Sequence, residues 1–183
     1  MKITPKYLTH LSSRVAIELN RSGLVKLVQG LEPISKEAAI ILEADMKKEL
    51  ALEERVNEIL EDHLDDIDDA LADERQLFFM IKKKIADEYG VILNYEERFS
   101  DISHKILDAI YEEDLINYDV TENRVKNIIY EALTSFIADN NEIDNAVTDK
   151  IHSYKREIIP GTEDYEILYE RLYKEELIKR GMA

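Results

Sequence analysis

Residues 122–158 read ENRVKNIIYEALTSFIADNNEIDNAVTDKIHSYKREI, and this stretch decides the fold. Its apolar residues recur at intervals of three and four, which is the period of an amphipathic helix. The spacing predicts one helix over residues 122–136, capped by Thr121, and another over residues 142–158. The two apolar faces consist of Val125, Ile128, Ile129, Ala132 and Phe136 in the first helix and of Ile143, Val147, Ile151, Tyr154 and Ile158 in the second.

The same period continues toward both ends of the chain. The 183 residues include only five glycines and three prolines, and neither type occurs between Pro33 and Gly90. This scarcity favours long helices over hairpins, so the sequence predicts an all-α fold. The other expected helices are residues 4–20, a helix capped by Ser35, residues 97–112, and a last helix capped by Thr162 after a tight bend at Gly161. Whether residues 56–89 form one helix or two, with a break near residues 71–74, is open at this point.

The two halves of the chain resemble each other. Leu8, Leu11, Val15 and Leu19 match Phe99, Ile102, Ile106 and Ile110 at a constant offset, and residues 77–90 match residues 168–181 at that same offset. We interpret this as a duplication that gives two related helical-bundle halves, residues 1–92 and 93–183. In this alignment the first half carries an insertion before its second helix. The linking residues 90–95 are few, so the halves are expected to pack together, and their long helices are compatible with an elongated shape.

Composition excludes several classes of site. Acidic residues outnumber basic ones by 40 to 24 and give a net charge of −16, which weighs against binding to a phosphate backbone. The chain has no cysteine, which removes disulfides, thiol nucleophiles, zinc–thiolate sites and iron–sulfur clusters. No apolar run approaches the roughly 20 residues of a membrane helix, and no secretory signal is recognisable. We therefore expect a cytoplasmic protein that binds neither a membrane nor a cofactor.

The end of the chain carries a distinctive pattern of residues. It consists of residues 150–156, then Ile158, Gly161 and Thr162, then residues 165–169, 175–177 and 179–181. This stretch resembles the C-terminal signature of a bacterial family catalogued as domain of unknown function 507. Tyr165 stands where the family pattern has Trp, and Ile159-Pro160 stands where it has an acidic residue. The resemblance weakens through residues 97–144 and is faint in the first half. It implies bacterial origin and a helical fold, and it supplies no activity and no catalytic residue.

The most biased segment is an acidic run over residues 53–74, with eleven carboxylates against one base. Carboxylates spaced by four on a helix could share a hard divalent cation. The weak candidates for metal ligands are Glu61, Asp62, Asp65, Asp66 and Asp69. A solvated helix face is the favoured interpretation, and docking to a basic partner is a further alternative.

One locally basic tract precedes the expected bend. It contains Lys150, His152, Lys155 and Arg156, and the next helix begins at Thr162. Helix N-termini bind anions through unpaired N–H groups, so we single out a candidate anion or partner site. Its residues are Lys150, His152, Tyr154, Lys155, Arg156, Thr162 and Tyr165. The competing interpretation is that Lys155 and Arg156 complement the dipole of the preceding helix, and that the tyrosines are packing residues.

These observations predict a helical interaction module, an adaptor or regulator whose partner is another protein. One alternative is a nucleic-acid- or ribosome-associated protein that uses residues 150–156. Another is a metal-dependent enzyme that uses the acidic run. We expect no enzymatic activity, because the four histidines stand apart from Ser/Asp arrangements of catalytic order and no glycine-rich phosphate loop is present.

Overall fold

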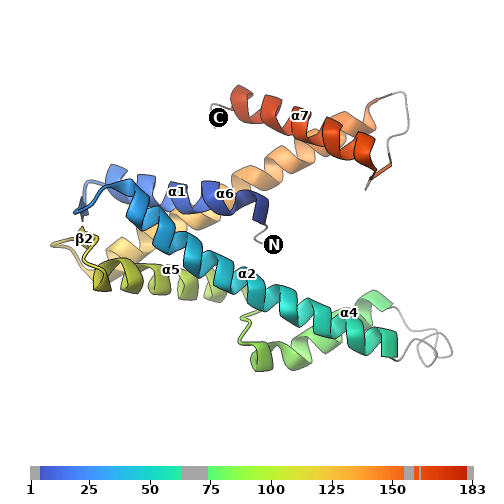
Figure 1. The fold of residues 1–183 in the computed structure, drawn as a ribbon, viewed down its shortest axis with the longest axis horizontal. Coiled ribbons are helices and arrows are strands. Elements are labelled where there is room, and N and C mark those ends of the chain that lie inside the picture. Colours follow the sequence, from blue (N-terminus) through green and yellow to red (C-terminus); the bar gives the residue numbers. More distant parts are fainter. Residues whose placement is uncertain (1–4, 63–73, 155–158, 161, 181–183) are drawn as a thin grey trace. The chain divides into compact units, whose positions relative to one another are not determined.

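The computed structural model describes residues 5–62, 74–154, 159–160 and 162–180 (Figure 1). Helices make up most of this part of the chain, and the predicted all-α fold is confirmed. The elements are α1 (Pro5–Arg21), β1 (Lys26–Leu27), α2 (Leu31–Asp62), α4 (Glu74–Ile85), the 3₁₀ helix η1 (Ala86–Tyr89), α5 (Tyr95–Glu112), β2 (Ile116–Asn117), α6 (Glu122–His152) and α7 (Glu163–Lys179). The chain divides into two compact units, residues 1–133 and 134–183. The predicted boundary at residues 92/93 lies inside the first unit.

Helix α6 is one continuous helix of 31 residues, so the prediction of separate helices over 122–136 and 142–158 was wrong. Its buried positions keep a spacing of three and four from Val125 through Phe136 to Ile143 and Ile151. Asn140 occupies the position on this face where the apolar pattern lapses, and its side-chain amide donates to the Phe136 carbonyl at 2.8 Å. Asparagine is only a mediocre helix former and not a helix breaker, so the helix continues through it.

Helix α2 begins at Leu31 and runs for 32 residues. The prediction that Ser35 caps this helix was therefore wrong. Pro33 lies in the first turn, where its missing N–H costs no intrahelical hydrogen bond. Ser35 lies inside the helix, and its hydroxyl is 3.3 Å from that of Ser13 on α1. Glu49 is buried in line with the apolar residues of this helix.

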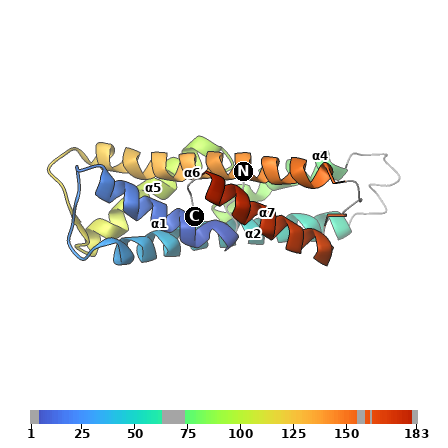
Figure 2. The same cartoon turned by 90° about the horizontal axis from the view of Figure 1, so that it is seen from above.

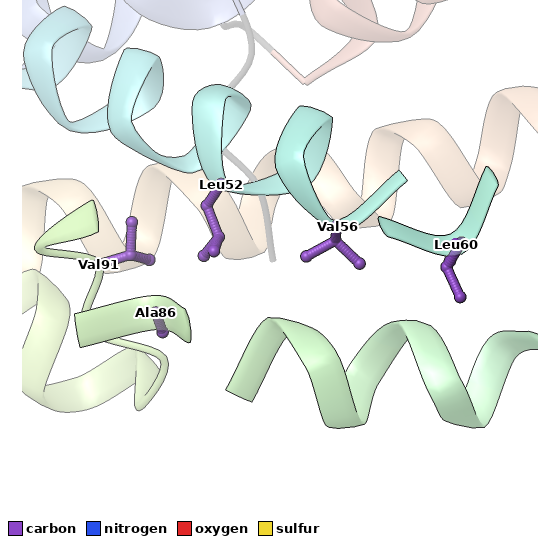
Figure 3. Close-up of a cluster of buried hydrophobic side chains, with 5 residues drawn as sticks. All are labelled: Leu52, Val56, Leu60, Ala86 and Val91. Atoms are coloured by element: carbon purple, nitrogen blue, oxygen red, sulfur yellow. The ribbon is translucent and has the colours of Figure 1, made fainter. Parts of the chain in front are cut away.

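Helix α4 packs back on α2, so among the described residues of the range 56–89, residues 56–62 belong to α2 and residues 74–85 to a separate helix, α4. Leu52, Val56 and Leu60 of α2 form a buried cluster with Ala86 and Val91 (Figure 3). Partly buried residues complete it: Leu77, Phe78, Ile81, Ile85 and Tyr89. Burial of such apolar side chains is the main force that holds the two helices together. The break predicted near residues 71–74 falls largely outside the described residues.

The order of elements repeats along the chain. Helices α1 and α5 end 91 residues apart, at Arg21 and Glu112, and helices α2 and α6 begin 91 residues apart, at Leu31 and Glu122. The predicted insertion before the second helix of the first half was therefore wrong. Strands β1 and β2 lie in the two equivalent loops and pair with each other in antiparallel fashion. We refer to α1 to α4 as the first repeat and α5 to α7 as the second; their order is what the predicted duplication requires.

Candidate interaction surface

The predicted basic site is only partly within the described residues. Lys155 and Arg156 lie outside them, so the structure does not test their role. Lys150 Nζ lies 3.0 Å from Glu175 Oε2 on α7. His152 is exposed at the last residue of α6, and Tyr154 is exposed just beyond it. The one described lysine of the tract thus already has an acidic partner within its own unit.

Thr162 and the tyrosines of α7 make contacts that hold α7 in place within its own unit. Thr162 is the N-cap of α7, as predicted, and its Oγ1 accepts a hydrogen bond from the Tyr165 N–H at 3.3 Å. The Tyr165 ring stacks on Tyr169, which in turn stacks on Tyr173. The Tyr169 hydroxyl donates to Asp144 and the Tyr173 hydroxyl to Asn140, both on α6. These contacts support the interpretation of the tyrosines as packing residues.

The acidic run is also only partly described. Glu61 and Asp62 are exposed at the end of α2, and Asp65, Asp66 and Asp69 lie outside the described residues. Within the part of the chain that the structure describes, no three His, Asp or Glu side chains are placed to hold a metal ion. The residues named for the metal and nucleic-acid alternatives thus lie mainly outside the described residues.

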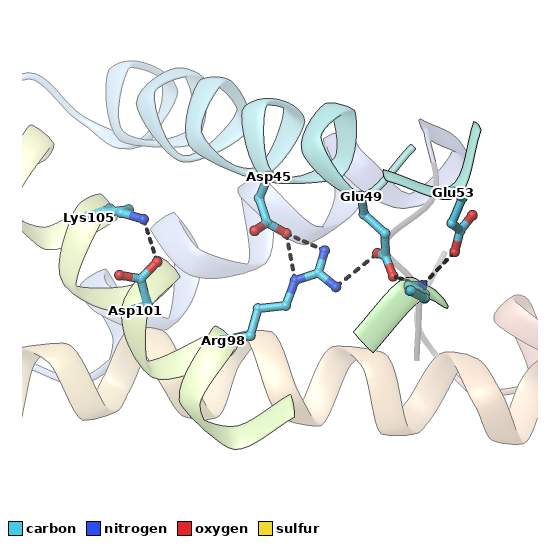
Figure 4. A network of polar contacts seen from close by, with 7 residues as sticks. Asp45, Glu49, Glu53, Arg98, Asp101 and Lys105 are labelled. Carbon is cyan, nitrogen blue, oxygen red and sulfur yellow. Dashed lines mark hydrogen bonds and ion pairs between the residues drawn. The ribbon is translucent and has the colours of Figure 1, made fainter. Parts of the chain in front are cut away.

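A buried ionic cluster joins α2, α4 and α5, and the sequence analysis missed it (Figure 4). Arg98 Nε donates to Asp45 Oδ2 at 2.9 Å, and Arg98 Nη1 lies 2.9 Å from Glu49 Oε2. Lys82 Nζ donates to Glu49 at 3.2 Å and to Glu53 at 2.8 Å. Burial opposes the charge of Arg98, yet the hydrogen bond and charge of Asp45, together with Glu49, raise its pKa above the ordinary value.

The second repeat has a polar pair at the positions equivalent to part of this cluster. Glu49 and Lys82 are each 91 residues before Asn140 and Tyr173, and both pairs are hydrogen-bonded. Glu49 and Asn140 are both buried. The same contact thus recurs with different chemistry, and in both repeats it joins one helix to its neighbour. We therefore assign the cluster to the fold, although it borders a small pocket of about 270 Å³.

An open and largely apolar groove lies between α1 and α2, two helices that run side by side (Figure 1 and Figure 2). It has a volume of about 560 Å³. Its lining includes a row of small residues, namely Ser12, Ser13, Ala16, Ser35 and Ala39. Two large apolar side chains also line it, Ile17 at 40% exposure and Leu31 at 42%.

The serine hydroxyls of the groove are engaged within the helix pair. Ser12 donates to the Thr9 carbonyl at 3.0 Å, and the Ser13 and Ser35 hydroxyls lie 3.3 Å apart across the two helices. Their hydrogen-bonding capacity is thus largely met by the protein itself. What the groove offers a ligand is mainly apolar surface and a shape.

The equivalent helix pair of the second repeat carries larger and charged residues at the same positions. Leu107 is equivalent to Ala16, Lys126 to Ser35 and Tyr130 to Ala39. The three side chains of the second repeat are buried or half-buried. Lys126 also bonds to Ser100 across the pair at 3.5 Å. At the rim of the groove, Ile17 and Leu31 are equivalent to Asp108 and Glu122 of the second repeat, which are both exposed. At these five positions the first repeat has smaller or more apolar side chains than the second, whereas Glu32 and Lys36 of the groove correspond to the uncharged Asn123 and Asn127.

Sequence periodicity could not have revealed the groove, because small residues on a helix face look the same whether a neighbour covers them or not. The signal that was available is the comparison of the two repeats. Once aligned at 91 residues, Ala39 against Tyr130 and Ile17 against Asp108 mark positions where the first repeat is smaller or more apolar.

None of the described helices combines the length and apolarity that crossing a membrane requires. The model of a family described as protein of unknown function (DUF507) matches residues 1–182. The match extends through the first half, where the resemblance was faint. A comparison with curated proteins finds no match.

Proposed function

We propose that this chain, which belongs to the DUF507 family of proteins of unknown function, is a helical interaction module that binds another protein through the groove between α1 and α2. In this role it acts as an adaptor or regulator and not as an enzyme. The proposal includes a bacterial cytoplasmic setting, which the cysteine-free sequence supports.

The difference between the two repeats is the observation that carries this proposal. A monomeric helix pair gains stability when the space between its helices is filled, as Tyr130 and Leu107 do in the second repeat. The first repeat leaves about 560 Å³ open and keeps Ile17 and Leu31 exposed beside it. Large exposed apolar residues around a concave surface are typical of a binding site.

Photo-crosslinking can test the location of the interface. The amino acid p-benzoylphenylalanine is introduced at Ile17 in one variant and at the equivalent Asp108 in another. Both variants are expressed in the native cell type and irradiated. We expect a discrete crosslinked product from position 17 and none from position 108. Equal products from both positions, or a product from position 108 alone, would contradict the proposal.

Affinity capture with matched surface variants gives a second readout. Ile17→Asp introduces the residue that the second repeat already has at this position, so we expect it to abolish capture of the crosslinked partner. Ile167→Asp changes an exposed isoleucine of α7 in the other unit and is the control. Equal capture by Ile17→Asp and the wild-type protein would show that the partner binds elsewhere.

A further inference from the structure

We infer that the pocket between the two equivalent loops of the first unit, residues 22–30 and 113–121, binds an aliphatic polyamine, a flexible chain that carries several ammonium groups. The pocket has a volume of about 490 Å³ and shares no lining residue with the groove between α1 and α2. The site therefore goes beyond the proposed function and does not depend on it. Its aromatic rings and its local charge point to this class of ligand.

Two tyrosine rings form part of the pocket wall. Tyr111, at the end of α5, and Tyr118, just after β2, line the pocket with their ring centroids 5.6 Å apart. Tyr111 is 55% exposed, so much of its ring is open to solvent. Aromatic rings attract ammonium groups through the cation–π interaction, and Leu24, Val25 and Val120 add apolar surface for methylene groups. The wall thus suits a ligand that alternates cationic and aliphatic segments.

The segment that carries these rings is strongly acidic. Residues 108–122 contain no base and six carboxylates, which are Asp108, Glu112, Glu113, Asp114, Asp119 and Glu122. All six residues are exposed, and none forms an ion pair with another residue in the part of the chain that the structure describes. Carboxylates alone make no site, because they cover much of a chain whose net charge is −16. Beside a pocket with aromatic walls they favour a cationic occupant.

Basic residues near the pocket are fewer. Lys26 lines it, and Arg124 lies in the first turn of α6. Arg21, at the end of α1, already has a partner, because its Nη1 lies 3.1 Å from Glu18 Oε1. Against six carboxylates these bases leave the charge around the pocket negative, at short distances where salt screens it least.

The carboxylates are spread out and not gathered at one point. Asp119 lines the pocket, while burial and then charges that include Glu122 and Asp108 raise the pKa of the Tyr118 hydroxyl above its ordinary value. Among the described residues, no three His, Asp or Glu side chains are placed to hold a metal ion. A calcium or magnesium ion needs several oxygens that converge on it. An extended polyamine instead meets separate carboxylates with separate ammonium groups.

The first repeat builds the same loop without these rings and carboxylates. Its residues at the positions of Tyr111, Tyr118, Asp108, Asp119 and Glu122 are Asn20, Leu27, Ile17, Val28 and Leu31. Both loops nevertheless contribute one strand to the same two-stranded sheet. The loop therefore needs neither the tyrosines nor the carboxylates in order to fold, and we attribute their joint presence in the second repeat to a ligand.

Isothermal titration calorimetry of the full chain with spermidine tests the site. We expect saturable binding of about one molecule per chain at low salt. Putrescine has one ammonium group fewer, so we expect it to bind at least about tenfold more weakly. Magnesium should displace spermidine no more than sodium chloride of matched ionic strength does. Binding of spermidine that does not saturate, or specific displacement by magnesium, would overturn the inference.

Variants at Tyr118 test the aromatic wall. Tyr118→Leu introduces the residue of the first repeat, and we expect it to weaken spermidine binding about tenfold. Tyr118→Phe keeps the ring and should bind spermidine nearly as well as the wild type. Circular dichroism of both variants confirms that they are folded. Equal affinity of Tyr118→Leu and the wild type would overturn the inference, since spermidine would then bind without this ring.

Matched charge variants separate the pocket from general attraction to an acidic chain. Asp119→Asn and Glu170→Gln each remove one exposed carboxylate, the first at the pocket and the second on α7 in the other unit. We expect only Asp119→Asn to weaken spermidine binding, by about threefold or more. Equal weakening by both would overturn the inference. A protein crosslinked at position 108 would also overturn it, because a small ligand leaves no such product.

Discussion

Single side chains fix where the helices of this protein begin and how they are held. Thr162 starts α7 because its hydroxyl accepts from an N–H that has no partner in the first turn. Arg98 holds α5 against α2 because its guanidinium meets carboxylates of two successive turns, those of Asp45 and Glu49. The first contact could be predicted from the sequence, because a threonine that follows a Pro-Gly turn and precedes a helical pattern is a typical N-cap. The second was not, because nothing in the sequence pairs Arg98 with residues about fifty positions away.

Removal of the Thr162 hydroxyl should weaken α7. Thr162→Ala should lower the free energy of unfolding by about 1 kcal/mol, because the Tyr165 N–H loses its acceptor. Thr162→Ser keeps the hydroxyl and should stay close to wild type. Chemical denaturation monitored by circular dichroism measures both. Equal stability of the alanine and serine variants would mean that the cap contributes nothing.

Removal of the Arg98 charge should be far more costly. Arg98→Met leaves the half-buried Asp45 without this cation and buried Glu49 with Lys82 as its remaining partner, and we expect a loss of about 3 kcal/mol in the free energy of unfolding. Arg180→Met removes an arginine that pairs with Glu142 and Glu176 at the surface, and its effect should be much smaller. Similar losses of unfolding free energy in the two variants would show that the buried cluster stabilises the fold no more than a surface ion pair does.

At the scale of elements, the helical period predicted which residues face the core of each helix better than it predicted where each helix begins and ends. The apolar positions from Val125 to Phe136 and from Ile143 to Ile151 lie on α6, whereas Tyr154 lies beyond its end and Ile158 outside the described residues. Residues 137–141 were predicted as a gap between two helices, and they are helical. A polar residue on an apolar face looks like an interruption when its partner, here Tyr173 on α7, lies on another helix. Glu49 of α2 is a buried polar residue of the same kind, and its partners Lys82 and Arg98 lie on other helices. Long helices are mis-segmented where a buried polar side chain has a distant partner.

Continuity of α6 makes a testable prediction. Asn141 is exposed and lies in the middle of the helix. Asn141→Pro should cost about 3 kcal/mol of stability, because proline removes an intrahelical hydrogen bond and clashes with the preceding turn. Asn141→Ala is the control and should be neutral or slightly stabilising. If residues 137–141 were a loop between two helices, the proline variant would unfold at nearly the wild-type denaturant concentration.

At the scale of the whole molecule, composition and period together were enough for the fold class but not for the binding surface. The groove between α1 and α2 depends on which side chains are small relative to their counterparts in the second repeat, as Ala39 is beside Tyr130. That comparison requires the two repeats to be aligned at 91 residues through the second helix. The helix start predicted at Ser35 implied an insertion there, so this alignment was missed. The anion site predicted around Lys150 rested on local charge alone, and local charge does not show that Glu175 is within 3.0 Å.

The charge of the whole chain predicts a salt effect on stability. At a net charge of −16 the folded chain repels itself, so raising sodium chloride should raise the melting temperature by screening. Magnesium at matched ionic strength should give a similar rise if the acidic run is a solvated face. A much larger rise with millimolar magnesium would instead indicate a bound divalent ion. Differential scanning calorimetry in the two salts makes the comparison.

The two compact units meet between Leu133 and Thr134, inside the continuous helix α6. A boundary within a helix offers proteases no extended loop to cut, so limited digestion should not release the units as intact fragments. A truncation at this point would leave the last four carbonyls of the shortened helix without partners. Gene fusion or domain shuffling at residue 133 would meet the same obstacle. The two units, each with its own packing, thus share a helix that neither can give up.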